Sequence, residues 1–336
     1  MTDRHARLDA FLDRAGWGMA ERAPLAADAS RRSYIRLTRP DGTRAMAMDA
    51  PPDAGEDVRP FVAMARHMRG LGLSVPEIRA EDVADGFLLL EDLGDDLLAR
   101  HVAAHPGDEP ALYAAAAAAL APLQDAPPPD TVADYAPLMP ELAALAIDWY
   151  APEAAAHRAD LVDAMADALD ALSGQPVLVH RDYHAENLLW LPERTGVARI
   201  GMLDFQDAMR GPAAYDLASL VHDPRRPVSG AARAAGIVAY AEATGAGDLS
   251  AALATCSAQR ALRILGVFAR LCLRDGKLRY LDFIMPTWAV LVRDLEHPAL
   301  ARLQRVAVHL PAPDPARLDA LRAKAGTYAG RDRVPS

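Results

Sequence analysis

The chain has 336 residues, of which 51% are hydrophobic and 24% charged, and its formal net charge is −10. This composition is typical of a globular protein of one to three domains and argues against a surface that binds nucleic acid or anionic membranes. No stretch approaches the roughly 20 apolar residues that cross a bilayer. The residues from Met1 to His5 also lack the apolar region of a signal peptide. We therefore expect a cytoplasmic protein.

The first third of the chain predicts a small antiparallel sheet with one main helix. That helix runs over residues 60–71, where apolar side chains share one face and Pro60 lies in the first turn. Strands are expected at residues 34–37, 45–48, 75–78 and 86–90, after an N-terminal helix at residues 5–16. We expect a domain boundary near residue 93, between an N-terminal lobe, residues 1–93, and a larger, mainly helical lobe, residues 94–336.

The remaining sequence is dominated by helical periodicity. Helices are expected at residues 108–124, 140–150, 154–173, 215–220, 231–245, 248–275 and 315–325. The long helix at 248–275 carries four arginines within roughly 80° of each other on a helical wheel: Arg260, Arg263, Arg270 and Arg274. Because this helix is otherwise apolar, its arginines need anionic partners. The sequence leaves two explanations open, a basic wall for a polar or acidic substrate and internal salt bridges.

The main chemical pattern lies between residues 177 and 204. Short apolar runs and a polar loop predict a hairpin-like pair of strands that presents Asp182, Asn187 and Asp204 at one end. Amide and carboxylate oxygens, as in Asn187 and Asp204, are ligands suited to Mg²⁺ on nucleotide phosphates. Asp182 can then orient an attacking hydroxyl and accept its proton. This is the form of a kinase catalytic loop.

These motifs resemble those of the aminoglycoside phosphotransferase family of small-molecule kinases. The resemblance is carried by His180-Arg181-Asp182-Tyr183-His184, Asn187, Leu203-Asp204-Phe205-Gln206-Asp207 and Tyr215-Asp216-Leu217. It covers about residues 5 to 310. Within the family, the segments at 28–34, 88–94 and 268–271 are similar to those of anomeric kinases that act on N-acetylmuramate and N-acetylglucosamine in cell-wall recycling.

The resemblance implies an α+β, bilobal, protein-kinase-like fold and a reaction that uses ATP and Mg²⁺. The γ-phosphate of ATP would move to a hydroxyl of a small molecule, an amino sugar in this branch. Asp182 would be the base, and Asn187 and Asp204 would complete the catalytic set as metal ligands. His180 and Asp216 would support the catalytic loop.

Further positions follow from the same resemblance as candidates for ligand contacts. Ser30 and Arg32 lie where a loop would cover the nucleotide phosphates, and their hydroxyl and guanidinium groups suit that role. Glu91 and Leu93 lie in the expected hinge, where backbone groups would meet the adenine. The candidate acceptor contacts are His184, Gln206, Arg270 and Arg274.

One expected kinase feature is missing. Kinases have a strand lysine that reaches the phosphates, but the two lysines here, Lys277 and Lys324, lie far downstream. The expected position falls near Met46 or Met48, and the helix at 60–71 has no glutamate in its interior. The substitutes to be weighed are three arginines and two acidic residues: Arg32, Arg36, Arg44, Glu56 and Asp57. This gap keeps a catalytically inactive, nucleotide-binding relative as an alternative.

A second alternative is a metal-dependent hydrolase. His180, Asp182, His184 and Asp204 could supply ligands for zinc or manganese, although the two histidines do not lie on a helix face. An aminoglycoside acceptor would need an acidic pocket and choline an aromatic cage, and the sequence indicates neither. We expect a small-molecule partner, with no nucleic acid and no membrane, while the sequence leaves the oligomeric state open.

Overall fold

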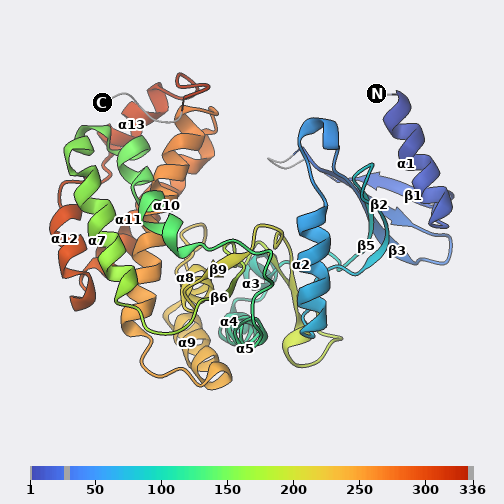
Figure 1. Ribbon diagram of the computed structural model, residues 1–336, viewed down its shortest axis with the longest axis horizontal. Coiled ribbons are helices and arrows are strands. Elements are labelled where there is room, and N and C mark those ends of the chain that lie inside the picture. Colours follow the sequence, from blue (N-terminus) through green and yellow to red (C-terminus); the bar gives the residue numbers. More distant parts are fainter. Residues whose placement is uncertain (1, 26–30, 332–336) are drawn as a thin grey trace. The chain divides into compact units, whose positions relative to one another are not determined.

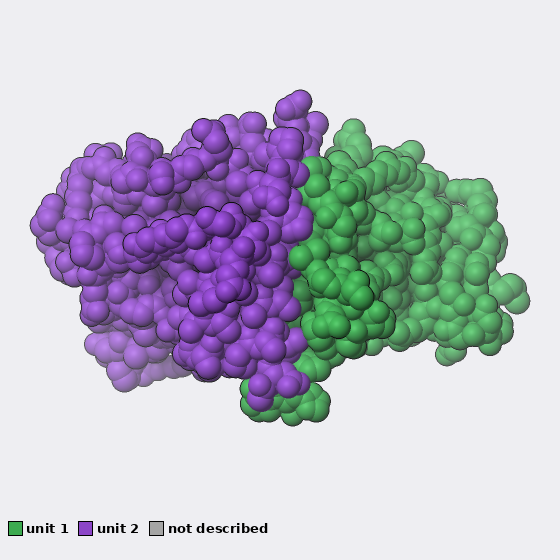
Figure 2. Space-filling view, turned by 90° about the horizontal axis from the view of Figure 1, so that it is seen from below, with its two compact units in different colours: residues 1–106, 185–208 green, residues 107–184, 209–336 purple. Residues whose placement is uncertain are grey.

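The computed structural model describes residues 2–25 and 31–331. The chain divides into two compact units. Unit 1 comprises residues 1–106 and 185–208, and unit 2 comprises residues 107–184 and 209–336 (Figure 2). The chain therefore leaves unit 2 after His184 and returns to it at Met209. The domain boundary expected near residue 93 stays a prediction.

Unit 1 is built on a five-stranded antiparallel sheet with the order β1-β2-β3-β5-β4 (Figure 1). The strands are β1 Glu21–Pro24, β2 Ser33–Thr38, β3 Arg44–Asp49, β4 Ile78–Asp82 and β5 Phe87–Glu91. The four apolar residues of β5 are all buried, because this strand lies between β3 and β4. Helix α1, Thr2–Arg14, packs Phe11 and Leu12 into a core with Leu37 of β2.

Two further helices and a hairpin complete unit 1. Helix α2, Arg59–Gly70, buries the apolar face that the sequence predicts, and α3 spans Leu98–Ala104. The hairpin pairs β7, Leu188–Trp190, with β8, Ile200–Met202. Ser74 fixes this hairpin, because its carbonyl accepts a hydrogen bond from the Met202 N–H (2.7 Å) and its hydroxyl donates to the Ala198 carbonyl (2.6 Å).

Unit 2 is mainly helical. Its helices are α4 Glu109–Ala118, α5 Ala121–Asp125, α6 Met139–Ala143, α7 Arg158–Asp170, α8 Tyr215–Val221, α9 Gly230–Thr244, α10 Ser250–Leu273, α11 Ile284–Leu295, α12 Ala301–Ala307 and α13 Pro315–Ala323. Helix α10 forms the centre of its core, since most of its residues are buried. At Gly266 a Cβ atom would lie 2.2 Å from backbone atoms of Leu145, so only glycine permits this close approach.

The structure confirms the predicted combination of a small antiparallel sheet with a larger helical part. Several local details differ from the sequence prediction. The strand expected at 75–78 is found at β4, Ile78–Asp82. The helix expected at 108–124 is interrupted between α4 and α5, and α11 and α12 were not predicted. The strand β6, Val177–Val179, pairs with β9, Met209–Gly211, and not with the β7–β8 hairpin. None of the helices in the described ranges is long and apolar enough to cross a membrane.

Candidate active site

The loop after β6 is fixed to unit 2 by a buried carboxylate. Asp216, near the start of α8, accepts hydrogen bonds from the N–H groups of His180 (2.6 Å) and Arg181 (2.9 Å). Arg181 has a φ of 76°, which is unfavourable for a residue with a side chain. Burial raises the pKa of Asp216, although the two N–H groups favour its ionised form. The two hydrogen bonds therefore help to hold a strained backbone conformation in place.

One aromatic contact and one hydrogen bond also stabilise this loop. The ring of His180 packs edge-on against Tyr183, with 5.6 Å between the centroids, and both residues are buried. The Tyr183 hydroxyl donates a hydrogen bond to the Ala116 carbonyl of α4 (2.7 Å). Asp182 thus stands on a backbone that contacts at two points keep rigid.

Asp182 lies in a strongly positive environment within unit 2. Burial opposes its ionisation, but Arg263 and Arg260 of α10 outweigh burial and lower the pKa of Asp182. His184 and Arg225 act in the same direction. The carboxylate is therefore ionised at neutral pH. Such a group is a weak base and a good hydrogen-bond acceptor, which suits the orientation of a hydroxyl in a loose phosphoryl-transfer transition state.

His184 is buried and neutral. Burial, together with the nearby Arg225 and Arg260, lowers the pKa of His184. A neutral imidazole could in principle ligate a metal. However, in residues 2–25 and 31–331 no group of three or more His, Cys, Asp or Glu side chains is placed to hold a metal ion. This finding does not favour the hydrolase alternative built on His180, Asp182, His184 and Asp204.

At the end of the β7–β8 hairpin in unit 1, the backbone brings Asn187 and the segment that leads to Asp204 together. The Leu203 N–H donates to the Asn187 carbonyl (2.9 Å), and Asp204 follows directly with a φ of 61°. Asp204 and Arg181 are the two non-glycine residues with positive φ in the described part of the chain. Backbone strain of this kind is common at functional sites. Both parts of the predicted motif, the loop with Arg181 and the hairpin end with Asp204, contain such a residue.

Asp204 is exposed and has one side-chain partner close in sequence. The Gln206 side-chain amide donates to its Oδ1 at 2.8 Å. Between them, Phe205 is fully buried and packs on Phe61 of α2, with 4.8 Å between the ring centroids. Helix α2 therefore supports the backbone that presents Asp204.

Of the three arginines considered in place of the missing lysine, Arg32 has the most kinase-like partner. Its Nε lies 2.7 Å from Oε2 of Glu56, just ahead of α2, and its charge also interacts with Asp207. Arg36 is instead bound by the hinge carboxylates of Asp92 and Asp95, each at 2.8 Å. The remaining arginine, at position 44, is exposed and lies 3.5 Å from Asp92.

The other predicted nucleotide contacts stay predictions. Ser30 lies outside the described residues. In the hinge, the Glu91 carboxylate pairs with Arg194 (2.6 Å) and the Glu91 N–H donates to the Glu77 carbonyl (2.8 Å). Leu93, two residues after Glu91, is half-buried.

On α10, the arginines that act on Asp182 differ from those chosen from the sequence. Arg263 donates to the Tyr215 hydroxyl (3.3 Å), and both Arg263 and Arg260 act on Asp182. Arg270 and Arg274 lie about 15 and 21 Å further along the helix than Arg260 at 1.5 Å per residue. Arg274 pairs with its neighbour Asp275 (2.7 Å).

Sequence reasoning therefore did not select three residues that surround Asp182. For Arg260 and Arg263, the signal was present as an i, i+3 pair on one helix face. For Arg225, which lies in the segment between α8 and α9, no sequence pattern was available.

Comparison with known proteins identifies the family of these motifs. The model of the phosphotransferase enzyme family matches residues 21–255, more than half of the chain. An N-acetylmuramate/N-acetylglucosamine kinase of Caulobacter vibrioides is 38% identical, covering 90% of this chain and 95% of that relative. A protein of the same name from Pseudomonas aeruginosa is 36% identical, covering 88% and 91%.

Solved structures agree at the level of the fold. A choline/ethanolamine kinase family protein from Mesorhizobium loti superposes with a TM-score of 0.63 at 15% identity, covering 95% of this chain and 99% of that one. A spectinomycin phosphotransferase in complex with ADP and spectinomycin gives a TM-score of 0.57 at 12% identity, covering 90% and 98%. These matches confirm the predicted protein-kinase-like fold.

Proposed function

The chain belongs to the phosphotransferase enzyme family, and from this premise we propose that it phosphorylates an amino sugar at the anomeric hydroxyl. ATP is the phosphate donor, and N-acetylmuramate and N-acetylglucosamine are the acceptors. One observation carries the choice of acceptor: relatives named for these two sugars match nearly the whole chain at 38% and 36% identity. A role in cell-wall recycling follows from the same names.

In this proposal Asp182 orients the acceptor hydroxyl and takes its proton as the phosphoryl group is transferred. The low pKa of Asp182, caused by Arg263 and Arg260 against the effect of burial, keeps the carboxylate ionised and ready to accept the hydrogen bond. Asp216 contributes indirectly, because it fixes the backbone from which Asp182 projects.

Asn187 and Asp204 would hold Mg²⁺. Their amide and carboxylate oxygens are the ligand types this ion prefers, and the exposed Asp204 leaves room for phosphate oxygens and water in the remaining positions. The ion would neutralise charge on the nucleotide phosphates. The role of this chain is to present the two side chains on a hairpin that Ser74 and Phe61 hold in place.

We further propose that Arg32 contacts the nucleotide phosphates in place of the strand lysine. Glu56 binds its Nε, and Tyr34 also interacts with its guanidinium group. An arginine whose Nε is held in this way could offer its outer nitrogens to phosphate oxygens. Arg32 and Glu56 would together take the place of the lysine–glutamate pair of other kinases, although they stand at other positions in the sequence.

The proposed cellular place is the cytoplasm, where ATP is available. Both cysteines, Cys256 and Cys272, are free and buried, which accords with a reducing compartment.

The direct test is transfer of labelled phosphate from ATP across a panel of acceptors. The panel contains N-acetylmuramate, N-acetylglucosamine, an aminoglycoside, choline and homoserine, with the Asp182→Asn variant as the control for background transfer. Labelling of the amino sugars with loss in the control supports the proposal. Labelling of an aminoglycoside alone would contradict the choice of acceptor. Binding of nucleotide without transfer to any acceptor would support the inactive relative.

A further inference from the structure

Arg260 is a buried cation without a hydrogen-bond partner in the part of the chain that the structure describes. Its exposed fraction is 3%, and within residues 2–25 and 31–331 none of its three guanidinium nitrogens has a hydrogen-bond partner. An isolated buried charge is costly unless an anion or polar group compensates it. Because most residues of α10 around it are buried and packed, an arginine without a hydrogen-bond partner here suggests a role in binding a ligand.

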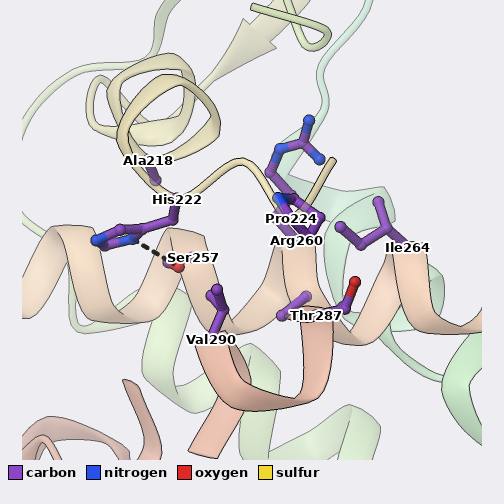
Figure 3. A pocket seen from close by; sticks show the side chains of 9 residues that line it. Ala218, His222, Pro224, Ser257, Arg260, Ile264, Thr287 and Val290 are labelled. Atoms are coloured by element: carbon purple, nitrogen blue, oxygen red, sulfur yellow. Dashed lines mark hydrogen bonds between the residues drawn. The ribbon is translucent and has the colours of Figure 1, made fainter. Parts of the chain in front are cut away.

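Its surroundings form a small pocket between three elements. Arg260 and Ser257 come from α10, His222 from the end of α8, and Val290 from α11 (Figure 3). The cavity measures about 10 Å³, which is room for about one water molecule. Figure 3 shows the guanidinium group on the side of the pocket away from Val290. This cavity is therefore too small to hold an anionic ligand.

A larger cavity of about 390 Å³ adjoins it and shares His222, Pro224 and Val290 with the small pocket. This volume lies in the range of small-molecule sites. Arg225 lines the larger cavity and is held in position by Asp223, at 3.3 Å. Its neighbour Arg226, by contrast, is engaged by Glu109 (2.8 Å) and by the hydroxyl of Tyr113.

Two arginines that line these cavities interact electrostatically with the residues around the proposed base. Arg260 and Arg225 both act electrostatically on Asp182 and on His184. With Arg263, three guanidinium groups thus lower the pKa of Asp182, the proposed base in unit 2. Asp182 cannot satisfy all three, and it makes no hydrogen bond to Arg260. The excess positive charge favours a second anion close to the acceptor hydroxyl.

We propose that Arg260, assisted by Arg225, binds the carboxylate of an acidic amino-sugar acceptor and so makes the enzyme favour acidic over neutral acceptors. This rests on the proposed function, in which the acceptor hydroxyl lies at Asp182. Of the two proposed acceptors, N-acetylmuramate carries a carboxylate and N-acetylglucosamine does not. The two sugars therefore differ in the group that this site would recognise.

The test compares both sugars in the wild type and in Arg260→Met, whose side chain is long, flexible and apolar. We expect KM for N-acetylmuramate to rise about 10–100-fold, the loss of one charge-assisted interaction. KM for N-acetylglucosamine and KM for ATP should stay within about twofold, and any fall of kcat that follows from removing a positive charge near Asp182 should be the same for both sugars. Arg260→Lys should restore part of the preference. Arg305→Met, a change of an exposed arginine on α12, is the matched control and should change none of these values.

Several results would overturn the proposal. An equal rise of KM for both sugars would mean that Arg260 does not recognise the carboxylate. A fall of kcat with both sugars and no rise of KM for N-acetylmuramate would mean that Arg260 acts only on Asp182 or on the transferring phosphoryl group. Thermal unfolding of Arg260→Met, expected at or above the wild-type temperature because an unpaired charge is removed, separates these results from misfolding.

Calorimetric binding of N-acetylmuramate keeps the two proposals distinguishable. If the wild type phosphorylates neither sugar, the proposed function fails, whereas weaker binding of N-acetylmuramate to Arg260→Met would still support the carboxylate site. Equal binding to the wild type and the variant would overturn the site whatever the enzyme phosphorylates.

Discussion

Arg32 and Arg36 of unit 1 differ from Arg260 of α10 in unit 2 in whether a carboxylate of the protein binds the guanidinium group. Arg36 has two carboxylates at 2.8 Å, and Arg32 has Glu56 at 2.7 Å. Arg260 is more deeply buried than either and has no hydrogen-bond partner in the described part of the chain. The difference teaches that charge alone does not identify a ligand contact, because the partners that an arginine has within the protein decide how much of its charge is left for a ligand.

The comparison also separates two kinds of role. Arg32 has a carboxylate on one side and keeps outer nitrogens for a further partner, whereas both carboxylates of the hinge enclose Arg36. Arg260 and Arg225 act electrostatically on Asp182, the proposed base. We therefore expect changes at these positions to affect different steps: nucleotide binding, stability and acceptor binding.

The largest expected effect is at the two acidic residues of the motif. Asp204→Ala should lower phosphate transfer about a thousandfold or more and weaken binding of magnesium nucleotide, because a metal ligand is lost. Asp182→Asn should lower kcat about 10²–10⁴-fold with little change in ATP binding. Steady-state kinetics and nucleotide titration measure both effects. Transfer at the wild-type rate by Asp182→Asn would show that the base is assigned wrongly.

A smaller effect separates Arg32 from Arg36. Arg32→Ala should raise KM for ATP about 10–100-fold, because one charge-assisted contact to phosphate is lost. Arg36→Ala, the matched change in the same strand region, should lower stability and leave KM for ATP within about twofold. The kinetics of both variants at saturating acceptor provide the measurement. If the two variants have the same KM for ATP, Arg32 does not take the place of the lysine.

A packing change on α10 tests whether effects at Arg260 come from binding or from the helix itself. Gly266→Ala places a methyl group 2.2 Å from the Leu145 backbone, so the free energy of unfolding should fall by about 1–3 kcal/mol. Denaturant unfolding gives this value. The preference for one sugar over the other should stay unchanged in this variant, and a changed preference would mean that displacement of α10 is enough to alter acceptor binding.

The smallest expected effect concerns His222, which borders both cavities. Burial, with Arg293 and Arg233, lowers the pKa of His222 from 6.5 to about 3. The unfolded chain binds the proton near pH 6.5 and the folded protein does not, so stability present above pH 6.5 is lost as the pH falls toward 3. The loss is at most about 1.4 kcal/mol per pH unit and is reduced by partial exposure.

Unfolding of the wild type and of His222→Gln at pH 7 and pH 5 measures this effect. The variant should lose less stability than the wild type between the two pH values. Equal losses would mean that His222 does not titrate differently in the folded and unfolded protein.

The sequence by itself determined the family and the class of fold, and it supplied the proposed catalytic motif. Residues 177–204 carry their information locally, because the spacing of Asp182, Asn187 and Asp204 lies within one short segment. Apolar periodicity likewise located β2, β3, β5, α2 and α10, since the buried face of a helix or strand is encoded in neighbouring residues. The resemblance to small-molecule kinases followed from these same local motifs.

Only the tertiary structure decided which charged groups are partners. Arg32 meets Glu56, which lies 24 positions further along the sequence, and α10 brings Arg260 rather than Arg270 to act on Asp182. The pairing of β6 with β9 likewise depends on the tertiary structure and could not be read from the local sequence. Periodicity shows that a side chain is on a face, but the partner of that face depends on long-range packing, which no local pattern contains.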